Sequence, residues 1–245
     1  MSDDRAVSDV VAFTLTFGII VASIGLVTFG STAALQGVRD DARSTAAEVS
    51  MNGFDTALQD VTRGVPRRRI AFDLSGDGLT RRDSSIHVAV DRADGSTVSA
   101  TVDTGAFVRS TTEDARIAAT SGALFRLQRG GQTTLDPPPF RCGEDTAHVT
   151  LVRFDGDVDV ASQGTAQIDL SRDATRLVHP DPSGGSTPAV DEVRVDVSNT
   201  AYPDAWAQAF DRHLGWESRG SGVYACDHVD RAVVRVVVID LDYVL

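Results

Sequence analysis

The chain has 245 residues and a formal net charge of −12 at pH 7, with 35 acidic residues against 23 Arg and no Lys. An acid excess of this size repels nucleic acid, so nucleic-acid-binding proteins are excluded as a first interpretation. The length allows one N-terminal helical segment and one further domain of roughly 180 residues, which is enough to bury a core.

The first element is an apolar run. Val10–Val38 contains no Asp, Glu, Lys or Arg between Asp9 and Arg39. A helix that crosses the roughly 30 Å hydrocarbon core of a bilayer needs about 20 apolar residues, and this run is longer than that. The sequence therefore predicts a transmembrane helix, with the lipid bilayer as a partner and a single-pass protein in the cell membrane whose C-terminal domain is extracellular.

The helical pattern continues beyond the apolar run. Apolar residues from Val38 to Val61 recur mostly at three- and four-residue steps with charged residues between them. Gly64 and Pro66 then provide a helix stop, because Gly favours the C-terminal cap and Pro cannot continue a helix. We expect one hydrophobic and amphipathic helix over residues 7–65, which forms a stalk after residues 1–6.

Beyond Pro66 the apolar residues alternate with polar ones, as in half-buried strands. The expected strands are 69–74, 85–90, 96–102, 122–129, 147–152, 158–160, 166–170, 176–179 and 192–197. The Asp-Gly pairs in 75–78 and 91–95 indicate hairpin turns. The Val-rich run 231–245 predicts a long central strand that is buried on both sides. We therefore expect an extracellular, all-β sandwich-like domain over residues 66–245, and an α+β architecture for the chain as a whole.

One short helix interrupts the β pattern. Pro203 stands at a first-turn position, and Trp206, Phe210 and Leu214 share one face. The interpretation that this helix closes an open end of the sandwich is favoured over a partner-binding face. The Asp181–Pro188 stretch is expected to be an exposed loop.

Cys142 and Cys226 are the two cysteines of the chain. An even pair in an extracellular domain is compatible with one long-range disulfide, and two buried free thiols are the alternative. Cys226-Asp227-His228 lacks a spaced second half, so a metal site is not expected there.

Motifs for catalysis and cofactor binding are absent from the sequence, including nucleotide-binding glycine loops, the nucleophile elbow and the HExxH zinc motif. Asp155, Asp157 and Asp159 alternate, but the Gly and Glu that complete a calcium loop are missing. Asp73 and Asp77 start a similar pattern that also lacks its final Glu. We expect no enzyme, no cofactor and no metal.

The residues in front of the apolar run resemble the class III signal peptide of archaeal type IV pilins, most closely the haloarchaeal ones. The matching residues are Arg5, Ala6, Val7, Ser8 and Asp9, with Asp9 in place of the usual Pro. The resemblance implies cleavage by a prepilin peptidase between Ala6 and Val7, with residues 1–6 as the leader. Asp9 would then either contact the terminal amine of a neighbouring subunit, together with Ser8, or lie in solvent.

The resemblance extends over most of the chain. The helix that ends at Arg63-Gly64, the 121–126 strand before Pro137–Phe140, and the Tyr202–Trp206 helix look like a family of haloarchaeal pilin-like surface proteins of unassigned function. The absence of Lys agrees with this, because Asp-rich surfaces without Lys are similar to those of halophilic proteins.

This resemblance implies a pilin-like, membrane-anchored cell-surface subunit that is exported and processed by a prepilin peptidase, and assembles with itself or other pilins through its N-terminal helix. The alternative is a single-span surface binding module that does not polymerise.

Overall fold

The computed structural model describes residues 3–74, 77–112, 115–156, 158–161, 164–181 and 188–244. Within these ranges the side chains of residues 3–11, 29–36, 40, 112, 161, 213–214 and 244 lie outside the described part. The chain divides into two compact units, Met1–Thr45 and Ala46–Leu245. Each unit is treated by itself below.

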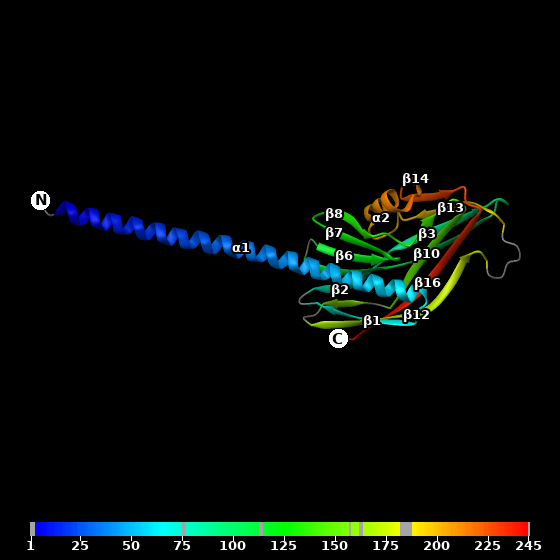
Figure 1. The fold of residues 1–245 in the computed structure, drawn as a ribbon, viewed down its shortest axis with the longest axis horizontal. Coiled ribbons are helices and arrows are strands. Elements are labelled where there is room, and N and C mark those ends of the chain that lie inside the picture. The colour runs from blue at the N-terminus through cyan, green and yellow to red at the C-terminus, as the bar shows by residue number, and fades with distance from the viewer. Residues whose placement is uncertain are drawn as a thin grey trace. The chain divides into compact units, whose positions relative to one another are not determined.

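The described residues form three β-sheets, shown in Figure 1. Sheet A has the order β1 (Arg67–Asp73), β12 (Thr165–His179), β16 (Arg231–Val244), β10 (Thr146–Asp155) and β9 (Arg141–Cys142). Sheet B has the order β11 (Asp159–Ala161), β2 (Gly78–Arg82), β5 (Ala106–Thr112), β6 (Ala115–Thr120), β7 (Ala123–Gln128) and β8 (Gly131–Asp136). Sheet C has the order β14 (Glu217–Gly220), β15 (Val223–Asp227), β13 (Val190–Asp196), β3 (Ser85–Arg92) and β4 (Thr97–Asp103).

In the described part of the chain, three helical elements accompany the sheets. Helix α1 spans Asp3–Arg63, and α2 spans Pro203–Ala209. A π-helical turn, η1, follows α2 over Phe210–Leu214 and ends at Gly215, whose φ of 69° is in the left-handed region. Helix α1 ends where Gly64 adopts a φ of 131°, two residues before Pro66.

The Val-rich C-terminal run forms the central strand of sheet A. Strand β16 pairs in parallel with β10 and antiparallel with β12, so both of its edges are occupied. Val234 and Val236 belong to one core, whereas Val237 and Ile239 belong to another. Strand β16 therefore contributes to both cores of the unit, which explains why apolar residues predominate in its sequence.

The hairpin of β3 and β4 forms where the Asp-Gly pair predicted it. The strands pair from Ser85 with Asp103 to Asp91 with Thr97. Gly95 has a φ of 82°, and the Asp94 carboxylate accepts hydrogen bonds from the Ser96 amide and hydroxyl, at 2.9 and 2.6 Å. The Asp side chain and the Gly conformation thus close the turn.

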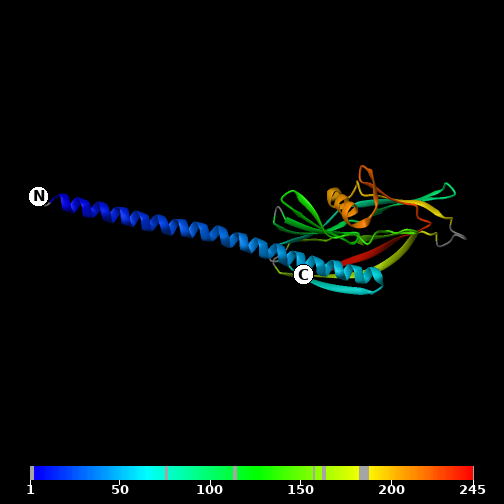
Figure 2. The same cartoon turned by 45° about the horizontal axis from the view of Figure 1, so that its top comes forward.

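The last part of α1 lies inside the second unit as a core element. Met51, Phe54, Leu58 and Val61 are all less than 2% exposed, and they pack with side chains of both sheet A and sheet B. The Phe54 ring stacks on Phe107 of β5, with 4.4 Å between ring centroids. Figure 2 shows this cyan end of α1 lying against the strands.

The expected transmembrane helix is not supported. Among the residues that the structure describes, no helix is long and apolar enough to cross a membrane. The predictions of a membrane-spanning stalk and of a single-pass membrane location are therefore wrong.

The expected sandwich fold class is also corrected. The protein is mostly β, but its strands form three sheets instead of the two of a sandwich. Two cores replace one, because α1 enters between sheets A and B while α2 packs with strands of all three sheets. Residues 46–65 belong to the same compact unit as the strands, whereas the sequence placed the boundary at residue 66.

Candidate functional site

The N-terminal unit exposes a continuous set of large apolar side chains. We call Ala12–Thr28 the apolar segment. Its large apolar residues are between 51% and 77% exposed. They are Phe13, Leu15, Phe17, Ile19, Ile20, Val21, Ile24, Leu26 and Val27. Soluble proteins rarely expose contiguous apolar surface of this kind unless another molecule covers it.

The apolar side chains lie on opposite faces of the helix. At about 100° per residue, Phe13, Phe17 and Ile24 fall within about 40° of one another around the axis. Leu15, Ile19 and Leu26 fall within about 40° of one another on the nearly opposite side. An amphipathic surface helix would carry one apolar stripe, whereas a helix that is apolar on several sides is buried in its working environment.

Small residues occupy the sector between these two faces. Gly18, Ala22 and Gly25 lie within about 60° of one another. A Cβ added at Gly18 or at Gly25 would meet nothing within 4 Å in the described structure. The distance between packed helices depends on the side chains at their contact, so this sector allows close approach by another helix.

Three hydroxyl groups of the apolar segment bond to the helix backbone. Thr16 Oγ1 donates to the Ala12 carbonyl at 2.8 Å, and Ser23 Oγ donates to the Ile19 carbonyl at 2.7 Å. Thr28 Oγ1 likewise donates to the Ile24 carbonyl at 2.8 Å. Because burial of a polar group is costly only when it lacks a partner, these three hydroxyls do not oppose burial of the segment.

A buried carboxyl group lies in the part of α1 that belongs to the second unit. Asp55 is 3% exposed, and its pKa is raised to about 7, first by burial and then by the neighbouring Asp136 carboxylate of β8. The Gln59 amide Nε2 donates to Asp55 at 2.7 Å and to Asp136 at 3.3 Å. The three side chains therefore link α1 to the edge of sheet B.

The residues of the expected processing site and assembly contact belong to α1. The backbone of Arg5, Ala6, Val7, Ser8 and Asp9 is helical, and their side chains lie outside the described part of the chain. Met1 and Ser2 also lie outside the described residues. The structure thus assigns no contact to Ser8 or Asp9.

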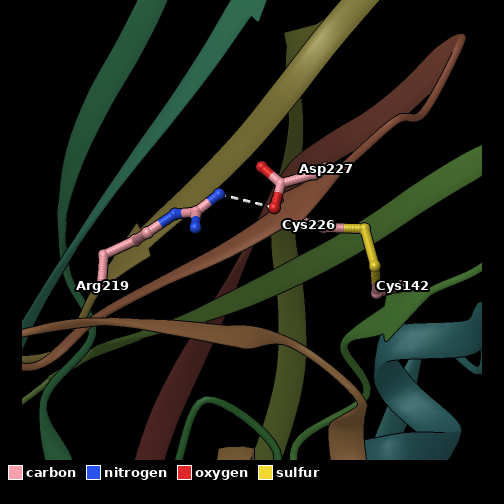
Figure 3. The surroundings of a disulfide bond; sticks show 4 residues. All are labelled: Cys142, Arg219, Cys226 and Asp227. Atoms are coloured by element: carbon pink, nitrogen blue, oxygen red, sulfur yellow. Dashed lines mark hydrogen bonds and ion pairs between the residues drawn. A yellow bond between two sulfur atoms is a disulfide. The ribbon is translucent and has the colours of Figure 1, made fainter.

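Cys142 and Cys226 are joined in a disulfide bond, with an S–S distance of 1.98 Å. The bond connects β9 of sheet A to β15 of sheet C, as Figure 3 shows. Beside it, Arg219 Nη2 donates to the Asp227 carboxylate at 2.5 Å, which holds β14 to β15. The two cysteines are therefore a covalent link between two sheets.

The Trp206 helix is a core element. Trp206 is completely buried, stacks with Phe140 at 5.8 Å between ring centroids, and meets Phe125 edge-on at 5.4 Å. This arrangement leaves no room for a partner on its apolar face and favours the interpretation that α2 closes the fold. Most of the expected Asp181–Pro188 loop, residues 182–187, lies outside the described residues.

Metal ligands do not converge among the described residues, which contain no cluster of three or more His, Cys, Asp or Glu side chains suited to a metal ion. Of the alternating acidic residues, Asp157 lies outside the described part, as does Ser75 between Asp73 and Asp77. Asp77 instead accepts hydrogen bonds from the buried Arg109.

Similarity to known proteins covers both the apolar helix and the three-sheet unit. Residues 5–242 match DUF7289, a family of unknown function. The chain belongs to this family. No curated protein and no solved structure matches it. The matched residues include nearly all of α1 and the strands of all three sheets. The family is of unknown function, so the match assigns no activity, ligand or partner.

Sequence reasoning missed two polar groups that position α1. Arg109 and Asp55 are both buried, and nothing in their local sequence separates them from the many solvated Arg and Asp residues. Only the helical period hinted at the burial of Asp55. Asp55 follows Phe54 and lies three residues before Leu58, so this period places the Asp55 side chain near the core-facing side of α1.

Proposed function

We propose that this DUF7289 protein is a structural subunit that assembles with copies of itself through its N-terminal helix, as pilin-like subunits do. The observation that carries the proposal is the apolar segment, whose large side chains are exposed on opposite faces of one helix. Two opposite faces require more than one neighbour for each helix. The proposal is therefore a multi-subunit bundle or filament instead of a closed dimer.

The energetics support such an assembly. Full burial of a large apolar side chain contributes about 1.5–3 kcal/mol, so the exposed side chains of the apolar segment together supply on the order of 15 kcal/mol. Association costs roughly 4–15 kcal/mol in lost translational and rotational freedom. The apolar segment alone can thus offset the cost of association, and its paired hydroxyls add no penalty.

The absence of charge supports a homotypic contact. No acidic or basic residue occurs between Asp9 and Arg39, so identical helices can lie side by side along this length without like charges opposing each other. The rest of the chain is strongly acidic, with a net charge of −12 for the protein as a whole. Salt therefore favours assembly in this proposal, because it screens repulsion between the acidic units.

Processing is part of the proposal. The resemblance of Arg5, Ala6 and Val7 to a pilin leader supports removal of residues 1–6 by a prepilin peptidase, and the disulfide is typical of exported proteins. Intact mass and terminal sequencing of the native protein test this step. The proposal expects Val7 as the first residue, and a native N-terminus at Met1 or Ser2 would contradict it.

Sedimentation of the full-length protein and of two matched variants tests the assembly itself. Ile20→Asp places a charge within the apolar segment, where Ile20 is 51% exposed. Val49→Asp introduces the same change on the same helix at a residue that is 68% exposed and lies in the second unit. We expect large assemblies for the unaltered protein and for Val49→Asp, and loss of them for Ile20→Asp. Equal sedimentation of all three proteins would contradict the proposal.

A further inference from the structure

A pocket lies beside the last turn of α1, within the second unit. Its cavity volume is about 280 Å³. Helix α1 contributes Leu58, Gln59, Thr62 and Arg63, the segment after β8 contributes Pro137–Phe140, and β9 contributes Arg141. Strands β10 and β16 contribute Thr150, Val152 and Arg235. Helix, proline-rich segment and central sheet thus meet around one cavity.

The charge of this pocket is opposite to that of the chain. Arg63, Arg141 and Arg235 line it against one carboxylate, Asp136. In the whole chain, by contrast, 35 acidic residues outnumber 23 basic ones. Throughout the described residues, none of these three arginines forms an ion pair with a carboxylate. The pocket therefore carries more arginines than carboxylates in a chain that is acidic overall.

Two of the arginines are oriented by neutral hydrogen bonds. Arg235 Nε donates to Thr150 Oγ1 at 2.9 Å, and Arg63 Nη2 donates to the Gln59 side-chain carbonyl at 2.9 Å. These bonds hold each guanidinium without neutralising it. Further N–H donors of both groups remain for an oxygen ligand, because a guanidinium carries five.

Asp136 is the one carboxylate among the residues that line the pocket, and Gln59 Nε2 donates a hydrogen bond to it. It shares the Gln59 amide with Asp55, and the pKa of Asp55 is raised to about 7 by burial and by Asp136. Three guanidinium groups therefore line the pocket against one carboxylate.

The remaining walls are apolar. Leu58, Phe140 and Val152 are each about 1% exposed. Pro138 is also buried, whereas Pro139 is exposed to solvent. Ligand pockets of proteins usually measure about 300–1,000 Å³, so this cavity suits a small molecule of about ten non-hydrogen atoms. Apolar walls with a few convergent charged groups are the usual composition of such sites.

We propose that this pocket binds a small organic carboxylate with an apolar body. The carboxylate accepts charge-assisted hydrogen bonds from Arg63 and Arg235, which is the geometry that a planar guanidinium favours. The apolar body packs against Leu58 and Phe140. This site is independent of the helix assembly proposed above, so either proposal can fail alone.

Fluorine NMR of the full-length protein tests the site with 4-fluorophenylacetate as the probe. The protein is kept dispersed in a non-ionic detergent at pH 6.5, because its apolar segment is exposed. The matched neutral probe is 4-fluorophenylacetamide, which has nearly the same shape and no charge. We expect saturable binding of the acid and at least tenfold weaker binding of the amide. Equal affinity of the two probes, or no saturable binding of the acid, would overturn the proposal.

Three variants locate the binding. Arg63→Gln and Arg235→Gln each remove one guanidinium from the pocket and are expected to weaken the acid about tenfold. Arg153→Gln changes the net charge equally on an exposed residue of β10 outside the pocket, and it should leave the affinity unchanged. A similar loss in all three variants would assign the effect to overall charge and overturn the site.

Inorganic phosphate provides the last arm of the test. The apolar walls predict that phosphate binds at least tenfold more weakly than 4-fluorophenylacetate. If phosphate competes with the acid at equal concentration, the pocket recognises the charge alone, and the assignment of an apolar body is wrong.

Discussion

Arg109 of β5 and Asp77 form an ion pair in which both side chains are buried, at 4% and 6% exposure. Arg109 Nε and Nη2 donate to the same Asp77 oxygen at 3.1 and 2.7 Å. The guanidinium also donates to the Asp73 carbonyl at 2.6 Å and to the Ser50 hydroxyl of α1. One buried cation thus joins sheet B, the segment after β1 and the helix.

Arg109→Met tests this relationship. The substitution leaves Asp77 buried without its partner, and removal of one member of a buried pair typically costs about 3–5 kcal/mol. Chemical denaturation followed by the fluorescence of the buried Trp206 and Trp216 measures the loss. Arg153→Met on the exposed side of β10 is the control and should change stability by less than about 0.5 kcal/mol. A loss below about 1 kcal/mol for Arg109→Met would show that the pair is dispensable.

The buried Asp55 predicts how stability depends on pH. In the unfolded chain this carboxyl loses its proton near its ordinary pKa of 3.8, whereas the folded protein keeps the proton until about pH 7, because burial and Asp136 raise the pKa. Between these values the folded state binds more protons, so the contribution of Asp55 to stability falls as the pH rises. The expected decrease is on the order of a few kcal/mol between about pH 4 and 7.

Asp55→Asn should remove that decrease, because the amide is uncharged at every pH and still accepts from Gln59. We expect the variant to be more stable than the unaltered protein at pH 8. Asp41→Asn, at an exposed position of α1, is the control and should keep the pH profile. Urea denaturation from pH 4 to 8 measures both, and an unaltered slope in Asp55→Asn would refute the assignment.

The disulfide predicts a large stability loss on reduction. Cys142 and Cys226 are separated by 84 residues, so the bond restricts the unfolded chain strongly, and losses of about 2–5 kcal/mol are typical when such bonds are removed. The double variant Cys142→Ala/Cys226→Ala should unfold at lower denaturant concentration and no longer respond to reductant. Equal stability of the oxidised and reduced protein would argue against the link between sheets A and C.

Gly156 predicts a backbone-specific effect. It has a φ of 99°, and an added Cβ would lie 2.6 Å from the Leu241 carbonyl oxygen of β16. Gly156→Ala should therefore cost more than the roughly 1 kcal/mol of the left-handed conformation alone. Gly130→Ala, with a φ of 77° and no atom within 4 Å of its Cβ, isolates that conformational cost. Equal losses in the two variants would show that β16 moves away freely.

The sequence predicted elements better than their arrangement. The alternation in β3, β4 and β10, the Asp-Gly turn and the central β16 follow from local patterns that the structure reproduces. Strands β5 and β6 were missed because their alternation is interrupted by Arg, Thr and small Ala residues, although both lie within sheet B. The division into three sheets depends on pairing between strands that are far apart in the sequence, such as β10 with β16. The alternation of apolar and polar residues within one strand does not indicate which strand it pairs with.

The candidate sites divide in the same way. The uncharged run Val10–Val38 was visible at once, yet its interpretation as a membrane span is not supported by the described residues. The cluster of Arg63 with Arg235 could not be foreseen, because these residues are far apart in the chain and meet only once α1 packs beside β16. The same holds for Asp55 and Asp136.

Cysteine cross-linking at Ile20 tests the central claim, helix-to-helix assembly, most directly. Both native cysteines are held in the disulfide, so Ile20→Cys adds one thiol within the apolar segment. Ser99→Cys adds one at an exposed position of β4 and is the matched control. The account predicts that mild oxidation links Ile20→Cys chains in pairs at dilutions where Ser99→Cys chains stay single. Equal cross-linking of the two variants, or none at position 20, would contradict it.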